Sequence, residues 1–483
     1  MMEWETVIGL EVHVQLRTRT KMFCADRTTF GDPPNTNVCP VCLGLPGALP
    51  VPNAEVVRLA VRAALVLGCT VHPTSVFARK NYFYPDLPKG YQISQFDRPL
   101  ATGGSVAFES GERGRIEVGV TRLHVEEDAG KLLHDRFPGK TAVDLNRAGI
   151  PLAEIVSEPD LRSPAEARAY LTTLRQILVY AGVSECSMEQ GSLRVDANIS
   201  IRRRGQSRLG TKTEVKNMNS FANVERALEA ERTRQVALVE AGQKVEQVTL
   251  LFNAGTGQVK ATRSKEESHD YRYFPDPDLP PLVLTPAWIE EQRATLPELP
   301  EGKRARLEAA YGLSAYDARV ITSEVELAGY FEAVVRAGSD PKIAANWVMG
   351  DVMTSYNETH EFPVAPEKLS SLIGLVKDGV VSHQAAKRVY AELATSAAAD
   401  APRSVAERLG LVQVSDRGAL AGWVDEVLAA NPGEVARFRN GETKLMAFFV
   451  GQVMKRSKGK ADPKGVQPVL EERLRQTADS RAG

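Results

Sequence analysis

"GLEVHVQL", residues 9–16, alternates apolar and polar side chains at every position. Its apolar positions hold four aliphatic residues: Leu10, Val12, Val14 and Leu16. Glu11, His13 and Gln15 occupy the positions between them. Because successive side chains of a strand point to opposite faces of a sheet, this stretch predicts a strand with one buried and one polar face. An acid beside an imidazole on the polar face makes this strand a candidate part of a functional site.

Three later segments show the same alternation and add ionisable residues to a polar face. They are "SLRVDANISIR" (192–202), "TKTEVKN" (211–217) and "LHVEEDAGK" (123–131). Their polar positions hold acids beside bases: Arg194 and Asp196, then Lys212, Glu214 and Lys216, then His124, Glu126 and Asp128. Carboxylate oxygens suit Mg²⁺, and arginine and lysine suit phosphate. The pattern indicates a magnesium and phosphate site on the sheet. The alternative is a solvated face without function, which is common in antiparallel sheets.

The organisation of the chain predicts an α+β fold. Period-2 segments separated by loops such as "PDLPKG" dominate residues 1–295, which indicates a domain centred on an antiparallel sheet. Helical patterns are interspersed there, one of them with Ser163-Pro164 as the expected N-cap and first position. Alanine-rich helical periodicity replaces the alternation from about residue 296, and a further division falls near 410. We therefore expect three domains, 1–295, 296–410 and 411–483, the last two helical.

The totals limit the class of protein. The 483 residues include 60 basic and 61 acidic side chains, so any contact with nucleic acid has to come from a local patch. The start, "MMEWETVIGL", lacks the pattern of a signal peptide, and no run of about 18 apolar residues suggests a membrane span. Five cysteines are too few for a disulfide scaffold, which favours a reducing compartment. The chain is expected to be cytoplasmic, with no membrane partner.

Two segments could contact nucleic acid. Residues 444–475 hold eight basic and three acidic side chains, and the run "KRSKGK" follows an apolar helical pattern. Its cations, suited to a phosphate backbone, are Lys455, Arg456, Lys458 and Lys460. The segment "RKNYFYPDLPKGYQISQ" (79–95) combines aromatic rings with cations, which can stack and clamp a nucleotide or an RNA end. The alternatives are a solvated charged tail and aromatic rings that only fill the core.

Two further motifs concern phosphate and zinc. In "GQSRLGTKT" (205–213) Thr211 separates the second glycine from the lysine, and a strand pattern follows, so a Walker-type loop is rejected. If ATP binds, it binds on the sheet. Cys24 and the pair Cys39–Cys42, together with Asp26 as an oxygen ligand, could form a zinc knuckle.

Long motifs in the same order from end to end resemble the family of B subunits of aspartyl/glutamyl-tRNA amidotransferases. They include "VIGLEVHVQLRTRTKMF", "PNTNVCPVCLGLPGALPVPN", "RKNYFYPDLPKGYQISQFD", "RLHVEEDAGK", "DLNRAGIPLAEIVSEPD", "GSLRVDANIS", "TKTEVKNMNSF", "DYRYFPDPDLPPL", "NWVMGDV" and "VGQVMKRSKGKADP". The resemblance implies a cradle domain, a helical domain and a tail domain similar to YqeY proteins. Zinc-bearing members resemble C-x-C followed by C-x-x-C, whereas Asp26 stands at the second position here.

The resemblance also implies an activity. Members phosphorylate the side-chain carboxylate of mischarged Asp-tRNA(Asn) or Glu-tRNA(Gln) with ATP, and ammonia then displaces the phosphate. The ammonia comes from a separate glutaminase, the A subunit, in a complex that also contains a small C subunit. This chain has neither an amidase signature nor a trusted cysteine–histidine pair, so we expect it not to make ammonia. The class expected is a carbon–nitrogen ligase that uses glutamine as amido donor.

By this resemblance we expect four residues at the magnesium site: Glu11, His13, Glu126 and Asp196. Glu214, with Glu127 and Asp128, is expected beside them. Their chemistry makes Arg194, Lys212 and Lys216 candidates for contact with phosphate or acyl phosphate. Tyr82, Tyr84 and Lys89 are expected at the mouth that receives the tRNA 3′ end. Two rival interpretations are a tRNA-binding scaffold with structural acidic strands and a stand-alone magnesium-dependent phosphotransferase for a small carboxylate.

Overall fold

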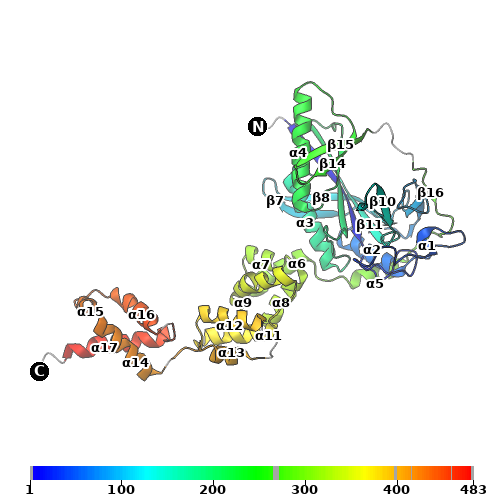
Figure 1. Cartoon of the computed structure of the whole chain (residues 1–483). Coiled ribbons are helices and arrows are strands. Elements are labelled where there is room, and N and C mark those ends of the chain that lie inside the picture. Colours follow the sequence, from blue (N-terminus) through cyan, green and yellow to red (C-terminus); the bar gives the residue numbers. More distant parts are fainter. Residues whose placement is uncertain (1–3, 265–270, 396–399, 415, 458, 480–483) are drawn as a thin grey trace. The chain divides into compact units, whose positions relative to one another are not determined.

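The computed structural model describes residues 4–264, 271–395, 400–414, 416–457 and 459–479 (Figure 1). It divides into two compact units, Met1–Pro300 and Glu301–Gly483. No helix within these described ranges is both long and apolar enough to cross a membrane.

One sheet organises the N-terminal unit. Its ten described strands follow the order β15-β14-β13-β12-β1-β11-β8-β6-β2, with β7 paired to β8. They are β1 (Trp4–Gln15), β2 (Thr70–Val71), β6 (Ala101–Thr102), β7 (Ser105–Ser110), β8 (Gly114–Glu127), β11 (Pro151–Ser157), β12 (Leu193–Arg203), β13 (Thr213–Lys216), β14 (Val248–Asn253) and β15 (Gln258–Ser264). Neighbouring strands are antiparallel except β13 and β14, which helix α4 connects in parallel. The predicted α+β class is confirmed, and the predicted antiparallel sheet includes one parallel pair.

Shorter elements surround the sheet. The remaining strands are β3 (Thr74–Ser75), β4 (Ala78–Asn81), β5 (Tyr91–Ser94), β9 (Lys131–Phe137), β10 (Lys140–Asp144), β16 (Phe274–Pro275) and β17 (Leu282–Val283). The helices of this unit are α1 (Pro40–Leu43), α2 (Ala54–Val66), α3 (Pro164–Tyr180), α4 (Phe221–Glu240) and α5 (Pro286–Ala294). The Ser163 side chain accepts a hydrogen bond from the Glu166 amide at the start of α3, which confirms the predicted N-cap.

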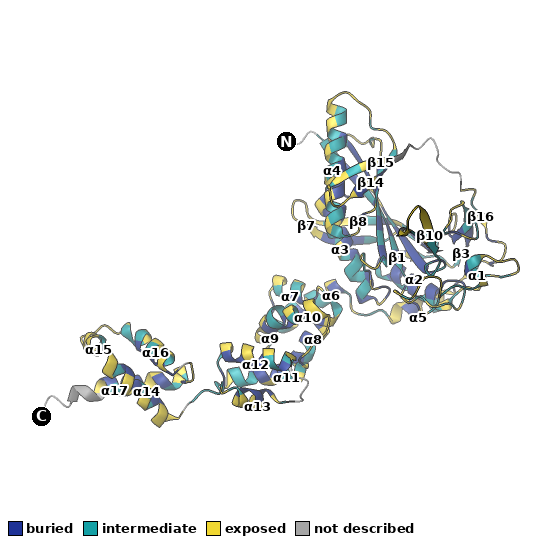
Figure 2. Ribbon diagram, in the orientation of Figure 1, coloured by how far each residue is buried: buried dark blue, intermediate teal, exposed yellow. Residues whose placement is uncertain are grey.

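The apolar side of the sheet packs against the long helices. Leu10, Val12 and Val14 of β1 lie in one buried cluster with side chains of α2, α3 and α4. Figure 2 shows this buried layer along the central strands. Burial of its aliphatic side chains is the main contribution that such a strand makes to the free energy of folding. Each Å² of apolar surface removed from water contributes about 25 cal/mol. The opposite parity of β1 therefore faces away from the helices.

The regular elements described in the C-terminal unit are helices, apart from one isolated β-bridge between Val414 and Ala461. Its elements are α6 (Pro300–Tyr311), α7 (Ala315–Ile321), α8 (Val325–Arg336), α9 (Pro341–Trp347), the π-helical segment η2 (Val348–Val352), α10 (Met353–Thr359), α11 (Pro366–Lys377), α12 (His383–Thr395), α13 (Pro402–Arg408), α14 (Arg417–Ala430), α15 (Pro432–Arg439), α16 (Leu445–Arg456) and α17 (Pro463–Asp479). One apolar core spans Leu307–Ala406 and another spans Leu420–Leu474. The three-domain division at 295 and 410 stays a prediction.

Candidate active site

Strand register brings the polar residues of four strands together. Glu11 of β1 lies opposite Asp196 of β12. His13 lies opposite Glu154 of β11, and Glu154 in turn lies opposite His124 of β8. Residues directly opposite in an antiparallel pair have Cβ atoms about 5 Å apart on the same face. The polar side chains of "GLEVHVQL" are therefore part of a continuous ionisable surface.

His13, Glu126 and Glu154 form the first group, which we call the histidine cluster. The His13 Nε2 atom lies 3.6 Å from Glu126 Oε1 and 3.3 Å from Glu154 Oε2. The buried His124 ring contacts the same two carboxylates. Its Nε2 atom lies 3.7 Å from Glu126 Oε2 and 3.3 Å from Glu154 Oε2. The Ser94 hydroxyl donates to Glu126. One ligand atom from each of the three cluster residues lies within 4.8 Å of the others.

The histidines and glutamates of this cluster hold each other in their charged forms. Burial alone would lower the pKa of His124, but hydrogen bonds to Glu126 and Glu154 raise it to about 9. Burial likewise opposes charge on His13, yet Glu154 and Glu126 raise its pKa. Burial would raise the pKa values of both carboxyl groups, whereas the two imidazoles lower them. The cluster therefore keeps two carboxylates ionised in a water-poor environment.

Glu11, Asp196 and Glu214 form the second group, which we call the carboxylate cluster. One oxygen from each lies within 4.8 Å of the others. Lys216 is the cation among them, since its Nζ atom pairs with Asp196 and lies 3.1 Å from Glu214 Oε1. Asn198 donates to Glu11 at 3.1 Å. Burial raises the pKa of Glu11, and the charges of Glu154, Glu214 and Asp196 raise it further.

The donor sets of both clusters fit a divalent cation. Three carboxylates facing one lysine leave excess negative charge, which adds to burial in raising the pKa of Glu11. Two carboxylates and one imidazole supply the oxygen and nitrogen ligands of the histidine cluster. Glu11 and His13 are two residues apart on one face of β1, so the Cα atoms that carry these two ligands lie about 7 Å from each other.

A pocket adjoins the carboxylate cluster. It has a volume of about 310 Å³ and lies over β1, β11 and β12. Its lining includes Glu11, Ser157, Asn198 and Lys212, with apolar contacts from Val7, Leu10 and Ile199. A concave site that joins apolar walls to a few charged groups is the usual form of a small-molecule site.

Comparison with known sequences decides the family. Residues 6–290 match the family described as GatB/GatE catalytic domain, and residues 329–474 match the family described as GatB domain. The chain belongs to the GatB/GatE family. Its relatives include the aspartyl/glutamyl-tRNA(Asn/Gln) amidotransferase B subunits of Moorella thermoacetica, 54% identical over 479 residues, and Geobacter sulfurreducens, 53% identical over 482 residues. In both cases the alignment covers 98% of this chain and 100% of the relative. The resemblance inferred from the motifs is confirmed.

Other predicted residues of this GatB/GatE member lie around the two clusters. Arg194 pairs with Asp128 at 2.9 Å, so in this state it neutralises an acid at the edge of the site. Glu127 is the neighbour of Glu126 on β8, so its side chain points to the opposite face of the strand, where it pairs with Lys89. Lys89 is therefore largely enclosed and not free at a mouth. Tyr82 contacts the ring of Tyr271, and Tyr84 is 47% exposed.

The four predicted tail cations belong to the C-terminal unit, and their contact with tRNA stays a prediction. Lys455 and Arg456 end helix α16, and Arg456 pairs with Glu426 at 2.5 Å. Lys460 lies just before α17 and is exposed. Lys458 lies outside the described residues.

Sequence reasoning missed two residues of this site. Glu154 belongs to the histidine cluster, and its only signal was an acid within the apolar run "PLAEIVS" (151–157). Lys80 is one of the cations of the segment 79–95, and the sequence did not assign it to the site. Its Nζ atom lies 4.8 Å from the centre of the Tyr271 ring. Burial would lower the pKa of Lys80, but Tyr273 and Glu126 raise it.

The predicted cysteine group also comes together. The Cys42 Sγ atom lies 3.7 Å from Cys24 Sγ, 3.9 Å from Cys39 Sγ and 3.1 Å from Asp26 Oδ2. The Lys21 Nζ atom lies 3.4 Å from Cys42 Sγ. The hydrogen bond from Cys24, assisted by Lys21, lowers the pKa of Cys42 to about 6. A thiolate with two further thiols and a carboxylate is a donor set that fits zinc.

Proposed function

We propose that this chain is the activating component of a tRNA-dependent amidotransferase. Its substrate is the side-chain carboxylate of Asp-tRNA(Asn), Glu-tRNA(Gln) or both, which ATP phosphorylates before ammonia replaces the phosphate. The observation that carries the proposal is a pair of clusters whose donors could hold metal ions, beside a pocket on one polar sheet face. Family membership and the names of relatives such as the Moorella protein support it.

The chemistry follows from the poor leaving group of a carboxylate. One carboxylate oxygen of the substrate attacks the γ-phosphorus of ATP, and the bond from that phosphorus to ADP breaks. Ammonia then attacks the acyl carbon and loses a proton, while the bond from carbon to the phosphate oxygen breaks. Mg²⁺, when bound, neutralises charge on the transferring phosphoryl group.

The residues of the chain divide this work. Glu11, Asp196 and Glu214 would hold one Mg²⁺, and His13, Glu126 and Glu154 would hold another. Lys212, which lines the pocket beside Glu11, is placed to contact the ATP phosphates. Arg194 and Lys216 carry positive charge next to the two clusters, where an acyl phosphate would form. Lys80 and the rings of Tyr82 and Tyr271 enclose the side that we assign to the aminoacyl group.

The proposal requires partners. The sequence contains neither a trusted cysteine–histidine pair nor an amidase motif, so a separate glutaminase, the A subunit, has to supply ammonia. A small C subunit would complete the heterotrimer. The complex would act in the cytoplasm, where charged tRNA is made.

ATP turnover by the reconstituted complex tests the function. With ammonium as nitrogen donor, we expect phosphate release with mischarged tRNA and at most about 1% of that rate with uncharged tRNA, because only the aminoacyl carboxylate accepts the phosphoryl group. Release that is equal with both tRNAs would contradict the proposal. Release stimulated by free aspartate or glutamate alone would instead favour the small-carboxylate phosphotransferase.

The tail is tested in the same assay. Replacing Lys455 and Lys460 with Glu should raise the tRNA concentration needed for half-maximal rate by about tenfold or more, because each cation lost from a phosphate contact weakens binding. The matched control is Lys377→Glu, on the C-terminal turn of helix α11. If the tRNA concentration for half-maximal rate stayed unchanged, the basic tail would be a solvated charged segment without contact to tRNA.

A zinc ion at the cysteine group is a separate proposal. We expect about one equivalent of zinc in the purified chain, held by Cys24, Cys39, Cys42 and Asp26. The Cys42→Ser variant should lose it, whereas Cys186→Ser, a buried thiol outside the group, should keep it. Metal analysis of the three proteins measures this. Equal zinc in all of them would place the metal elsewhere.

A further inference from the structure

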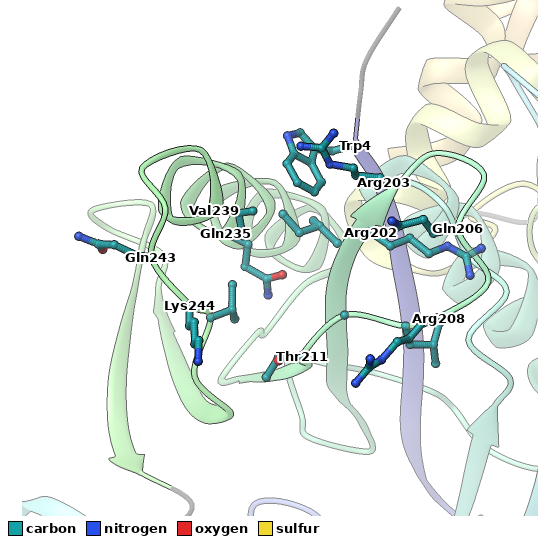
Figure 3. A pocket seen from close by; sticks show the side chains of 14 residues that line it. Trp4, Arg202, Arg203, Gln206, Arg208, Thr211, Gln235, Val239, Gln243 and Lys244 are labelled. Atoms are coloured by element: carbon teal, nitrogen blue, oxygen red, sulfur yellow. The ribbon is translucent and has the colours of Figure 1, made fainter.

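A second pocket lies at the C-terminal end of strand β12 and shares Leu209 and Gly210 with the pocket beside Glu11. It has a volume of about 380 Å³ and opens between the C-terminal end of α4 and the loop 204–212 (Figure 3). Leu209, Val239 and Val245 supply apolar walls. The loop is pressed onto β12 at Gly210, where an added Cβ atom would lie 2.1 Å from the carbonyl oxygen of Ile201. This wall therefore depends on glycine and is part of the fold.

The lining of this pocket is cationic. Its four charged side chains are Arg202, Arg203, Arg208 and Lys244, and none of its lining residues is acidic. Arg202 is neutralised by Glu5 at 2.6 Å, and Arg203 lies over the Trp4 ring at 5.5 Å. Arg208 and Lys244 have no hydrogen-bond or ion-pair partner among the residues that the structure describes. Two such cations at one mouth are placed for an anionic group.

A buried acceptor lies deeper in the same pocket. The Gln235 side chain is fully buried, and its Nε2 atom donates to Thr213 and Glu231, each at 2.9 Å. Its Oε1 atom has no hydrogen-bond partner among the described residues. Leaving a buried amide oxygen unpaired costs about 1–3 kcal/mol, so Oε1 would gain from a hydrogen-bond donor. Figure 3 shows the side chains of Gln235, Arg208 and Lys244 around this pocket.

We propose that this pocket binds a nucleoside monophosphate whose base carries an exocyclic amino group. The amino group would donate to Gln235 Oε1, the base would lie between the apolar walls, and the phosphate would contact Arg208 and Lys244. The volume is in the range of small-molecule sites. The inference does not rest on the proposed function, because none of the clustered acids lines this pocket.

Calorimetric titration of the full chain with AMP, in buffer without divalent cations, tests the inference. We expect saturable binding that becomes about tenfold weaker in Arg208→Gln and again in Lys244→Gln, since each change removes a charge-assisted contact. Both side chains are exposed and unpaired within the described part of the chain, so their loss should leave the fold unchanged. Arg204→Gln, on the same loop but outside the pocket lining, is the matched control and should bind as the unaltered chain does.

Two more arms locate the base and separate this pocket from the one beside Glu11. IMP, which has a carbonyl group in place of the amino group, should bind about tenfold more weakly than AMP, because it would set an acceptor against Gln235 Oε1. The Glu11→Gln and Lys212→Gln variants should bind AMP normally. Absent AMP binding, equal binding of AMP and IMP, or loss of binding in the Glu11 and Lys212 variants would each overturn the inference.

Discussion

Replacing Asp196 with Asn should abolish amide formation by the reconstituted complex even when ammonium is supplied. Asp196 provides one carboxylate of the cluster with Glu11 and Glu214 and also pairs with Lys216. Asn keeps the size of the side chain but removes the charge that a hard divalent cation requires. We expect a loss of about 10³-fold or more in turnover, which corresponds to about 4 kcal/mol of transition-state stabilisation. Conversion of mischarged tRNA to its amide form measures it.

Two controls make this result specific. Glutamine hydrolysis by the glutaminase partner should persist in the Asp196→Asn complex, because the proposal places the ammonia-producing site on another chain. Glu291→Gln, an exposed acid of helix α5, should leave amide formation unchanged. Amidation retained in Asp196→Asn would sink the role of the carboxylate cluster and would favour the tRNA-binding scaffold with structural acidic strands.

The sequence predicted well which side chains of a single strand share a face. Period-2 alternation identified which side chains of β1 and β12 share a face, because side-chain direction in a strand depends on parity alone. Glu11, His13, Asp196 and Glu214 were placed on polar faces for this reason, and the structure brings them into two clusters. The same reasoning predicted the buried parity of "GLEVHVQL" and the start of helix α3.

The alternation of side chains within one strand does not show which strands pair with each other or in which register. Glu154 faces His13 only because β11 pairs with β1 in one register, and a shift by one residue would turn it to the helices. The sequence of its strand, "PLAEIVS", is a mostly apolar run without a clear alternation, and the strand is almost wholly buried. Lys89 shows the same limit, because its loop returns to the sheet at Glu127 and gives the lysine a partner far along the chain. Such contacts depend on long-range topology.

The charge arrangement predicts two separate metal sites, which can be counted. Mn²⁺ accepts the same oxygen and nitrogen ligands as Mg²⁺ and is visible by electron paramagnetic resonance. We expect the full chain to bind two Mn²⁺ ions. Glu154→Gln should abolish one site and Glu214→Gln the other, because each change removes one of only three ligands from its cluster. The double variant should bind neither ion, and Glu291→Gln should bind both.

The two sites should also differ in how protons compete with the metal. His13 and His124 stabilise the carboxylates of the histidine cluster, and the glutamates raise the pKa values of both imidazoles. A metal that binds His13 has to displace its proton, so occupancy there should rise as the pH increases through and above the ordinary histidine range. Glu11, Asp196 and Glu214 contain no imidazole, and their site should change little over that range. Loss of both ions in either single variant would show instead that the six ligands form one coupled centre.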